Sequence, residues 1–379
     1  MPITLITGDV ATDTVNASQR LPDISDQVAM LEPDATPLVV LLKKLRKRMA
    51  QQPKVEWLES EAMPRFDATT ATAASNSGSI GVANGNFFRV GDFVRNTATG
   101  EGFEVTATAA GTLTVNRGIG SVAAAAMGAT DELFIINNVN QEGASLREIK
   151  TVKVANAFNY CQIERTPFGV TGTEAAAKMV SGPELDRLER NTALEHMRAL
   201  EQTVLFGARK EDLGTTGKPK RFAGGITEFV VTNTSNGGGT LTEATFAGFL
   251  RQGFRYGSSR KALVAAPLVV QAIEGFARNN IRVVNDQATT YGITMRQYVS
   301  GQGEVDIIMD RALADSTKYR GYAFLLDIDS LYYAPLRDTQ LLRNRQPNDA
   351  DKIEHEFMTE FSLVVEHERR HAILYGVTG

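Results

Sequence analysis

The sequence contains little of the chemistry that most enzymes and metal proteins use. Its 379 residues include one cysteine, Cys161, one tryptophan and four histidines. A single cysteine cannot form an internal disulfide or a thiolate metal cage, which is consistent with folding in a reducing cytoplasm. No apolar run approaches the roughly 20 residues that a membrane helix needs, and the N-terminus lacks the charged and apolar regions of a signal peptide. We therefore expect no membrane span, no disulfide framework and no signal peptide.

Positive charge is concentrated at one place. Forty Lys and Arg residues against 44 Asp and Glu residues give a net charge of −4, so any nucleic-acid contact must be local. Five basic residues could neutralise a few phosphates without reading sequence. They could equally be the solvated face of a short helix or a docking site for an acidic partner, and the sequence favours neither. These residues are Lys43, Lys44, Arg46, Lys47 and Arg48.

One metalloenzyme motif is present in its letters. Residues 367–371, His-Glu-Arg-Arg-His, match the H-E-x-x-H pattern, in which one helix face carries two zinc-binding imidazoles and the glutamate acts as a base. The surrounding residues 361–375 are at least as typical of a strand, which would place His367 and His371 about 13 Å apart. None of the eight residues after His371 could supply a third ligand. Charged strand or capping residues are the favoured interpretation, and a zinc-dependent hydrolase is the alternative.

The other candidate sites are weaker. Cys161 lies in a probable strand with no histidine near it in the sequence, which argues against a nucleophile. Four aspartates follow two predicted strands, where they could hold a divalent ion, but strand-end aspartates also start turns and cap helices. These are Asp306, Asp310, Asp327 and Asp329. We therefore predict no catalytic residue, no metal and no cofactor.

The N-terminal part of the chain is predicted as an arm followed by an interrupted strand pair. Residues 1–50 form the arm, with a short helix from about residue 38 to 45 whose leucines recur at helical spacing. Residues 54–61 alternate like a strand. A second strand-like stretch, residues 159–170, could pair with them across everything between. The first 50 residues have no core of their own in this interpretation.

The residues between the paired strands are predicted as an inserted β-rich module, residues 67–145. Its first part, residues 68–86, is rich in Ala, Thr, Ser, Asn and Gly and is expected to be a flexible connector. Short β-patterned pieces follow at intervals of roughly 8–12 residues, which is typical of a small barrel or sandwich. These pieces are residues 87–90, 93–95, 102–106, 112–115 and 132–136.

The second half of the chain predicts a long helix and then mixed α/β structure. Residues 183–206 carry one apolar stripe, with Pro183 at the expected first helical position and Gly207 at the exit. Residues 240–243, Thr-Leu-Thr-Glu, match a capping box that would begin another helix. Strands and helices alternate from there, and the chain closes with β-type sequence.

Several segments resemble a known family. They are residues 34–38 (Asp-Ala-Thr-Pro-Leu), 56–59 (Glu-Trp-Leu-Glu), 159–164 (Asn-Tyr-Cys-Gln-Ile-Glu), 200–207 (Leu-Glu-Gln-Thr-Val-Leu-Phe-Gly) and 359–374, which ends the match. Together with the order of elements, they resemble major capsid proteins of tailed bacteriophages with the Hong Kong 97 fold. The resemblance spans nearly the whole chain. The chain resembles a subgroup of these proteins that has a β-rich insertion, because the minimal fold lacks such a module.

This resemblance implies an α+β capsid fold with named parts. The arm would be residues 1–50, the two sides of the long hairpin called the E-loop residues 51–66 and 155–175, and the inserted barrel-like module residues 67–145. The peripheral (P) domain would be residues 176–240, with the spine helix at 183–206, together with the closing β-segment 331–379. The axial (A) domain would be residues 241–330.

The resemblance also implies a structural protein and no enzyme. The subunit would self-assemble into hexamers and pentamers of an icosahedral head that encloses double-stranded DNA without sequence specificity. It would be made in the bacterial host cytoplasm and end in the virion. A separate scaffolding protein and a portal are implied partners, a cement or decoration protein is a further candidate, and no membrane is involved.

Two kinds of contact residue follow from the resemblance. The basic run at 43–48 would face DNA or contact the arm, and four E-loop residues would contact a neighbouring subunit: Glu56, Trp57, Glu59 and Glu61. A shell protein of a cellular nanocompartment, which shares the fold, is the alternative within the same class. A packaged enzyme in place of DNA would distinguish it.

Overall fold

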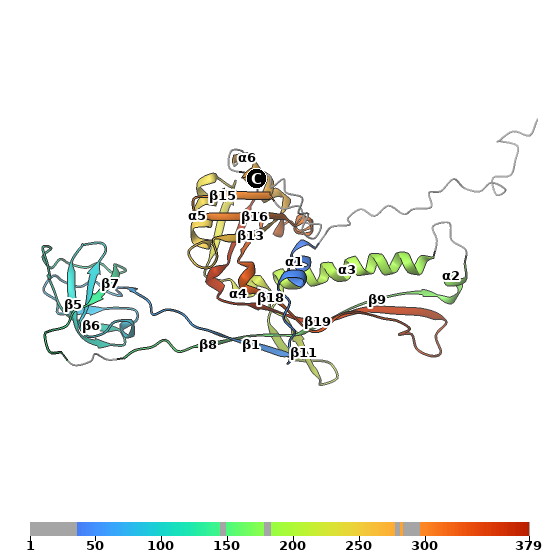
Figure 1. The fold of residues 1–379 in the computed structure, drawn as a ribbon, viewed down its shortest axis with the longest axis horizontal. Helices are drawn as coiled ribbons and strands as arrows, with labels where there is room; N and C mark the ends of the chain where they lie inside the picture. The colour runs from blue at the N-terminus through green and yellow to red at the C-terminus, as the bar shows by residue number, and fades with distance from the viewer. Residues whose placement is uncertain (1–35, 145–148, 178–182, 277–280, 283–295, 379) are drawn as a thin grey trace, which may run out of the picture. The chain divides into compact units, whose positions relative to one another are not determined.

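A computed structural model describes residues 36–378, apart from residues 145–148, 178–182, 277–280 and 283–295. The predicted arm is therefore described only from residue 36 onward. The chain divides into two compact units. One consists of Met1–Trp57 and Ala157–Gly379, and the other consists of Leu58–Asn156. Each is described below by itself (Figure 1).

The larger unit contains a central seven-stranded sheet of mixed direction. Its order is β12 (Thr234–Gly239), β20 (Ala372–Val377), β17 (Ala323–Leu326), β13 (Arg260–Ala265), β16 (Gly303–Met309), β15 (Arg296–Ser300) and β14 (Ile281–Arg282). The helices α5 (Glu243–Gly253) and α6 (Pro267–Phe276) belong to the same region (Figure 1). Strands β12 and β20 lie outside the predicted A-domain range. The sheet therefore joins residues from both sides of residues 241–330.

The middle of the central sheet is buried on both faces, because its strands β13 and β17 are apolar and buried almost throughout. Leu263 and Ala265 of β13 pack into one cluster with the apolar side chains of α5 and α6. Ala262 and Val264 of the same strand pack into a second cluster with the long helix α3 (Glu184–Phe206) and α1 (Pro37–Leu45). Because successive side chains on a strand point to opposite faces, one strand contributes to both cores.

A second, antiparallel sheet of three strands supports the long helix. Its order is β18 (Leu331–Leu342), β19 (Lys352–Val365) and β9 (Gln162–Thr171). The helix α3 contacts β9 and β19 and runs alongside them (Figure 1). The predicted single strand at 159–170 is divided at Cys161. Its first part belongs to β8 (Ala155–Tyr160), which pairs with β1 (Lys54–Glu59), whereas β9 pairs with β19.

The long helix has the predicted extent, and its caps differ in detail. Pro183, predicted at the first helical position, occupies the N-cap, so the helix begins one residue later, at Glu184. Gly207 is the C-cap. Leu200 and Val204 of the predicted apolar stripe are fully buried. A Cβ at Gly207 would meet Thr203 O at 2.6 Å and would also meet Ala223 O. The exit therefore requires glycine because the chain turns closely there.

The start of α5 differs from the predicted capping box. Its N-cap is Thr242, whose side chain accepts a hydrogen bond from the backbone N–H of Thr245 (3.3 Å). The predicted cap, Thr240, lies two residues too early. Both threonines can cap a helix, so local sequence could not choose between them.

The smaller unit, Leu58–Asn156, contains residues 67–145 of the predicted module, and its sheet is barrel-like. Six strands are ordered β2 (Phe66–Ala68), β7 (Glu132–Asn138), β4 (Asp92–Asn96), β5 (Gly102–Ala109), β6 (Thr112–Asn116) and β3 (Ser79–Gly81). A bridge between Thr69 and Val82 joins the two edges. The expectation that residues 68–86 are a connector is wrong, because Ile80 is fully buried in the module's core. Residues 87–90 do not form the expected strand. The 3₁₀ turn η2 (Gly85–Phe87) ends at the first of them, and the others have no regular structure.

The remaining elements of the larger unit are short. Two strands, β10 (Lys210–Leu213) and β11 (Pro219–Phe222), form a separate hairpin. The short helices are α2 (Gly172–Ala176) and α4 (Ile226–Phe229), and the 3₁₀ turns are η4 (Arg311–Asp315), η5 (Tyr319–Gly321), η6 (Ile328–Ser330) and η7 (Glu368–Arg370).

Candidate functional site

The predicted basic run does not form a single cluster. The Lys43 ammonium donates a hydrogen bond to Thr339 Oγ1 (2.9 Å) and lies 5.3 Å from the centre of the Tyr333 ring. Burial lowers the pKa of Lys43. Arg46 pairs with Asp329, and Lys47 pairs with Asp338. These three side chains thus attach residues 43–47 to their own subunit.

The other two basic side chains, Lys44 and Arg48, are exposed. The backbone beside them extends the attachment, because Arg48 N–H donates to Tyr333 O (3.0 Å) and Tyr333 N–H donates to Arg46 O (2.9 Å). Residues 46–50 therefore lie along β18. We call α1 together with residues 46–50 the arm root.

A buried histidine connects the sheet, the long helix and the arm root. One ring nitrogen of His196 is 2.8 Å from Thr166 Oγ1 on β9, and the other is 2.7 Å from Thr359 Oγ1 on β19. Thr359 donates onward to Thr339 Oγ1 (2.9 Å), which also accepts from Lys43. Burial, with the Lys43 charge as a second cause, lowers the pKa of His196 to about 4. The ring is therefore neutral at physiological pH.

The predicted E-loop contacts divide into one core residue and three carboxylates. Trp57 is only 6% exposed and packs against Phe229, with ring centroids 5.8 Å apart. Trp57 therefore lies in the core of its own subunit and has little surface left for a neighbouring one, and its role as a subunit contact stays a prediction. Glu56 and Glu61 are exposed and Glu59 is partly exposed. A hydrogen bond with Glu56 raises the pKa of Lys54.

A buried asparagine fixes the strand pair of β1 and β8 beside Trp57. The Asn159 side chain donates to Gly224 O (2.9 Å) and Leu363 O (2.7 Å), and its Oδ1 accepts from Gly224 N–H (2.8 Å). It thereby ties β8 to β19 and to the loop after β11. This is the physical role of the first residue in one of the resembling segments, and a shorter or apolar side chain could not make these three bonds.

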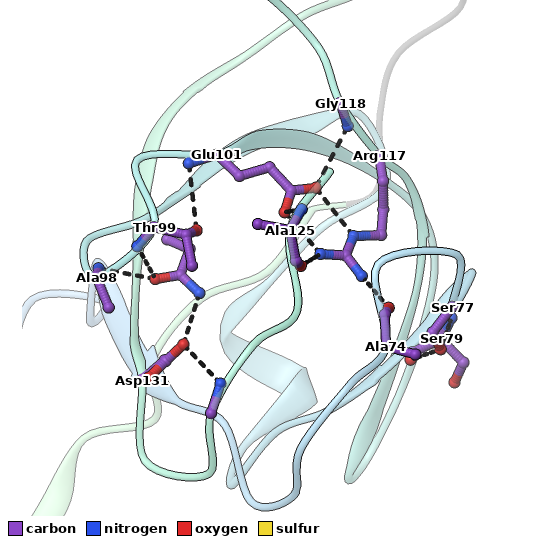
Figure 2. A network of polar contacts seen from close by, with 12 residues as sticks. Ala74, Ser77, Ser79, Ala98, Thr99, Glu101, Arg117, Gly118, Ala125 and Asp131 are labelled. Atoms are coloured by element: carbon purple, nitrogen blue, oxygen red, sulfur yellow. Dashed lines mark hydrogen bonds and ion pairs between the residues drawn. The ribbon is translucent and has the colours of Figure 1, made fainter. Parts of the chain in front are cut away.

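A buried ion pair organises the inserted module (Figure 2). The Glu101 carboxylate accepts from Arg117 Nε (2.9 Å) and Nη2 (2.6 Å), and from the backbone N–H groups of Ala125 (3.0 Å) and Gly118 (3.3 Å). Burial by itself raises the pKa of Glu101, but these hydrogen bonds outweigh burial and lower it. We call Glu101 and Arg117 the module clamp.

The module clamp is part of a larger polar network. The Arg117 guanidinium also donates to the carbonyls of Ala74 and Ala125. On the other side, Asp131 accepts from the Asn96 side chain (2.9 Å) and from Gly128 N–H (2.9 Å). Figure 2 shows both groups of contacts around the long loop between β6 and β7. Residues 117–131 therefore keep a defined path without regular secondary structure.

The H-E-x-x-H letters do not form a zinc site. His367 has a left-handed backbone (φ 52°) and precedes the single turn η7, so the motif lies on neither a long helix nor a strand. Glu368 accepts from Val231 N–H (3.0 Å) and Thr232 N–H (3.3 Å). His371 is fully buried and accepts from Asp327 N–H (3.2 Å). The expected strand through 361–375 is thus interrupted, and Glu368 and His371 both accept hydrogen bonds from backbone N–H groups of other segments.

The four aspartates also have separate roles. Asp310 caps η4 and Asp327 caps η6, while Asp306 pairs with Arg260 (2.8 Å). Over the described ranges, no three His, Cys, Asp or Glu side chains are grouped so that they could hold a metal ion. No described helix is both long enough and apolar enough to cross a membrane.

Three contacts that matter most were not predicted, namely those of His196, Glu201 and the module clamp. His196 and Glu201 appear in the sequence as polar interruptions of the buried half of α3. That interruption is a usable signal, since buried polar groups need partners. The partners could not be named, because they lie on distant strands.

The comparisons with known proteins agree with this architecture. A family model described as SU10 major capsid protein matches residues 6–378. The major capsid protein of Pseudomonas phage PaMx41 is 27% identical over 163 residues, which are 42% of this chain and 38% of that protein. The match thus spans well under half the length of this curated relative.

Solved structures share the fold at low sequence identity. The capsid asymmetric unit of Cyanophage A-1(L) has a TM-score of 0.56 at 10% identity and covers 97% of this chain and 100% of that one. A chain of Mycobacterium phage Bobi has a TM-score of 0.53 at 9% identity and covers 98% and 100%. The capsid of Myoviridae Phage XM1 has a TM-score of 0.51 at 10% identity and covers 96% and 98%.

The solved structures show that the chain has the Hong Kong 97 fold, and the family model defines its class as a phage major capsid protein. Within that class, the chain belongs to the SU10 major capsid protein family. The family favours a phage head over a cellular nanocompartment, and a structural role over the zinc hydrolase.

Proposed function

We propose that this chain assembles into hexamers and pentamers of an icosahedral phage head around double-stranded DNA. The observation that carries the proposal is the β1–β8 ribbon. It is a two-stranded sheet that links the larger unit to a separately folded module. An isolated two-stranded ribbon is marginally stable in water, so a neighbouring subunit is the natural source of its missing contacts.

Sedimentation velocity with negative-stain images of the purified protein tests this proposal. Pentamers, hexamers or closed particles are the expected species. A chain that stays monomeric alone and also when expressed with its scaffolding protein contradicts the proposal.

We assign the parts of the shell subunit as follows. The arm is residues 1–50, ending in the arm root, and the E-loop stem consists of β1 and β8. The inserted module is residues 67–145, and α3 with β9, β18 and β19 forms the P domain. The A domain is the region of α5 and α6 with the central sheet. Deleting residues 1–35, which keeps α1 and its buried side chains in the core, should leave a folded subunit that no longer closes shells, and intact particles from this truncation would refute the arm assignment.

The three stem carboxylates are the proposed subunit contacts. The exposure of Glu56 and Glu61 and the partial exposure of Glu59, on and just beyond β1, support this role. The substitution Glu61→Lys should reduce the yield of closed particles without changing the melting temperature of the subunit. The matched control is Glu243→Lys, at the first residue of α5. Equal yields from the two variants would refute the stem contact.

Lys44 and Arg48 are the proposed DNA-facing side chains of the basic run. Both are exposed, and neutralising a few phosphates gives affinity that falls with salt. The pair of substitutions Lys44→Gln and Arg48→Gln should leave shells that form normally and release DNA at lower salt. Unchanged salt dependence of DNA release would refute this role.

The remaining proposals concern partners and location. We infer that the protein is made in the host cytoplasm, ends in the virion, has no enzymatic activity and needs no cofactor. A separate scaffolding protein, a portal and a decoration protein are its proposed partners. Co-expression with the neighbouring genes of its phage and mass spectrometry of purified particles would identify them.

A further inference from the structure

The N-terminus of α1 is capped by a carboxylate from the spine helix. Thr36 occupies the N-cap position, but its side chain makes no capping hydrogen bond. The Glu201 side chain of α3 instead accepts hydrogen bonds from the backbone N–H groups of Leu38 (2.9 Å) and Val39 (2.7 Å), one at each carboxylate oxygen. These N–H groups are donors that a helix's first turn leaves without intrahelical partners. The spine helix therefore holds the start of the arm root.

A second carboxyl group is buried close to this cap. Glu201 is 1% exposed, and Asp310, which follows β16, is fully buried. Asp310 Oδ1 accepts from Ala312 N–H (2.9 Å), whereas its Oδ2 is buried without a hydrogen-bond partner among the described residues. Burial raises the pKa of Glu201 to about 8, with the Asp310 charge as the second cause, and burial raises the pKa of Asp310 to about 6.

The other charged groups near the pair do not neutralise it. Asp315 on η4 adds negative charge near Asp310. On α1, the Lys43 ammonium bonds to Thr339, and on α3, His196 is neutral. Neither Glu201 nor Asp310 forms an ion pair with any described residue. Two ionised carboxylates would repel strongly in this apolar surrounding, so the pair retains one proton around neutral pH.

The hydrogen bonds decide which residue carries that proton. Both oxygens of Glu201 accept backbone N–H groups, so a proton on either would face a donor. Asp310 Oδ2 has no donor against it. The proton therefore belongs on Asp310, even though burial raises the pKa of Glu201 further than that of Asp310. The carboxylate charge then belongs on Glu201, at the positive end of α1.

We propose that the proton on Asp310 allows Glu201 to stay ionised and cap α1, so that the two residues form a proton-linked latch between the arm root and the spine helix. Opening α1 removes the donors of Glu201 and exposes its carboxylate to water. A solvated charge on Glu201 no longer repels a charge on Asp310, so Asp310 then holds its proton less tightly. Because the closed latch binds the proton more tightly than the open one, raising the pH favours opening. The latch should weaken from about pH 4, where solvated carboxyl groups titrate, to about pH 8, and then level off.

Hydrogen exchange on the full-length, unassembled subunit tests the latch independently of shell assembly. The readout is the protection factor of Pro37–Leu45, corrected for the intrinsic exchange rate, at pH 5 and pH 8. In the wild type it should fall by at least about tenfold, because one proton changes the opening equilibrium by up to about tenfold per pH unit. The internal reference is α5, whose cap is a threonine hydroxyl, and it should not respond.

Two variants separate the roles of the carboxyl groups. Asp310→Asn resembles the protonated acid and keeps an acceptor for Ala312, so protection of α1 should become independent of pH. Glu201→Gln cannot accept at both positions, so protection should be low at both pH values. The same pH dependence in Asp310→Asn as in the wild type would overturn the proposal, as would full protection in Glu201→Gln. If the variants misfold, the wild-type series still decides, because equal pH sensitivity of α1 and α5 would exclude a local latch.

Discussion

Removing Arg117 should unfold the inserted module selectively. Arg117 is 6% exposed and its partner Glu101 is fully buried, so the substitution Arg117→Ala leaves a buried carboxylate without its counter-charge. Breaking a buried ion pair by removing one partner costs about 3–5 kcal/mol. The guanidinium also holds the carbonyls of Ala74 and Ala125, which lose their donor at the same time. The polar groups around the long loop would then be only partly satisfied.

The expected size of the effect makes it measurable. A loss of 1 kcal/mol lowers the melting temperature of a 60–100-residue domain by about 4–8 °C, so about 3 kcal/mol lowers that of the module by more than about 10 °C. Differential scanning calorimetry should then show the module melting well before the larger unit. Hydrogen exchange would locate the loss in residues 58–156.

A matched control and a rescue make this prediction stringent. Arg95→Ala removes an exposed arginine from β4 of the same module and should change the melting temperature little. Replacing both partners, Glu101→Leu with Arg117→Met, should recover part of the stability, because no buried charge remains. If Arg117→Ala melts like the wild type, the module clamp is not what holds the loop, and the reasoning is refuted.

Three further predictions concern the larger unit. Gly207→Ala should lower the free energy of unfolding of this unit in urea by a few kcal/mol, because the new Cβ would meet Thr203 O at 2.6 Å. The control Gly248→Ala lies in open space on α5 and should have little effect. Equal effects of the two substitutions would contradict the close packing at the helix exit. In the Asp310→Asn variant, which removes the opposing contribution of the latch proton, acidification from pH 7 to pH 5 should destabilise this unit, because burial holds the pKa of His196 at about 4 and that of His371 at about 3. The unfolded chain then binds protons below about pH 6.5 that the folded chain rejects, and a flat stability profile of this variant would contradict their burial. Cys161, whose pKa burial raises to about 12, should react with a thiol reagent at pH 8 only after unfolding, and rapid labelling of the folded protein would show that the site is open.

Local sequence was sufficient where the signal is carried by neighbours along the chain. One apolar stripe, with a proline and a glycine at its ends, predicts the 23-residue helix α3, and the helix forms at that position. The sequences of β5 and β6 alternate between apolar and polar residues and lie between turn signals, so the existence of these strands was predictable although their order in the sheet was not. The segments that resemble capsid proteins led to the family before any contact was known.

Prediction from local sequence failed where a segment is compatible with more than one local conformation. Residues 68–86 have the composition of a linker, yet Ile80 and Val82 complete the module's core because the barrel needs a closing strand there. The H-E-x-x-H letters permit a helix, a strand or a turn, and the contacts of Glu368 with the loop before β12 select the turn. Such choices depend on partners far away in the chain.

The sequence by itself determined the family, the long helix and the absence of obvious catalytic machinery in its composition. Only the tertiary structure decided what the polar residues do. The partners of Lys43, His196 and Glu201 cannot be identified from the sequence. In the structure, each of these side chains helps to join the arm root to the spine helix or to the sheet beside it. The physical reason is that a buried polar group must find a partner, and that partner is specified by the packing of distant elements and not by its neighbours in the chain.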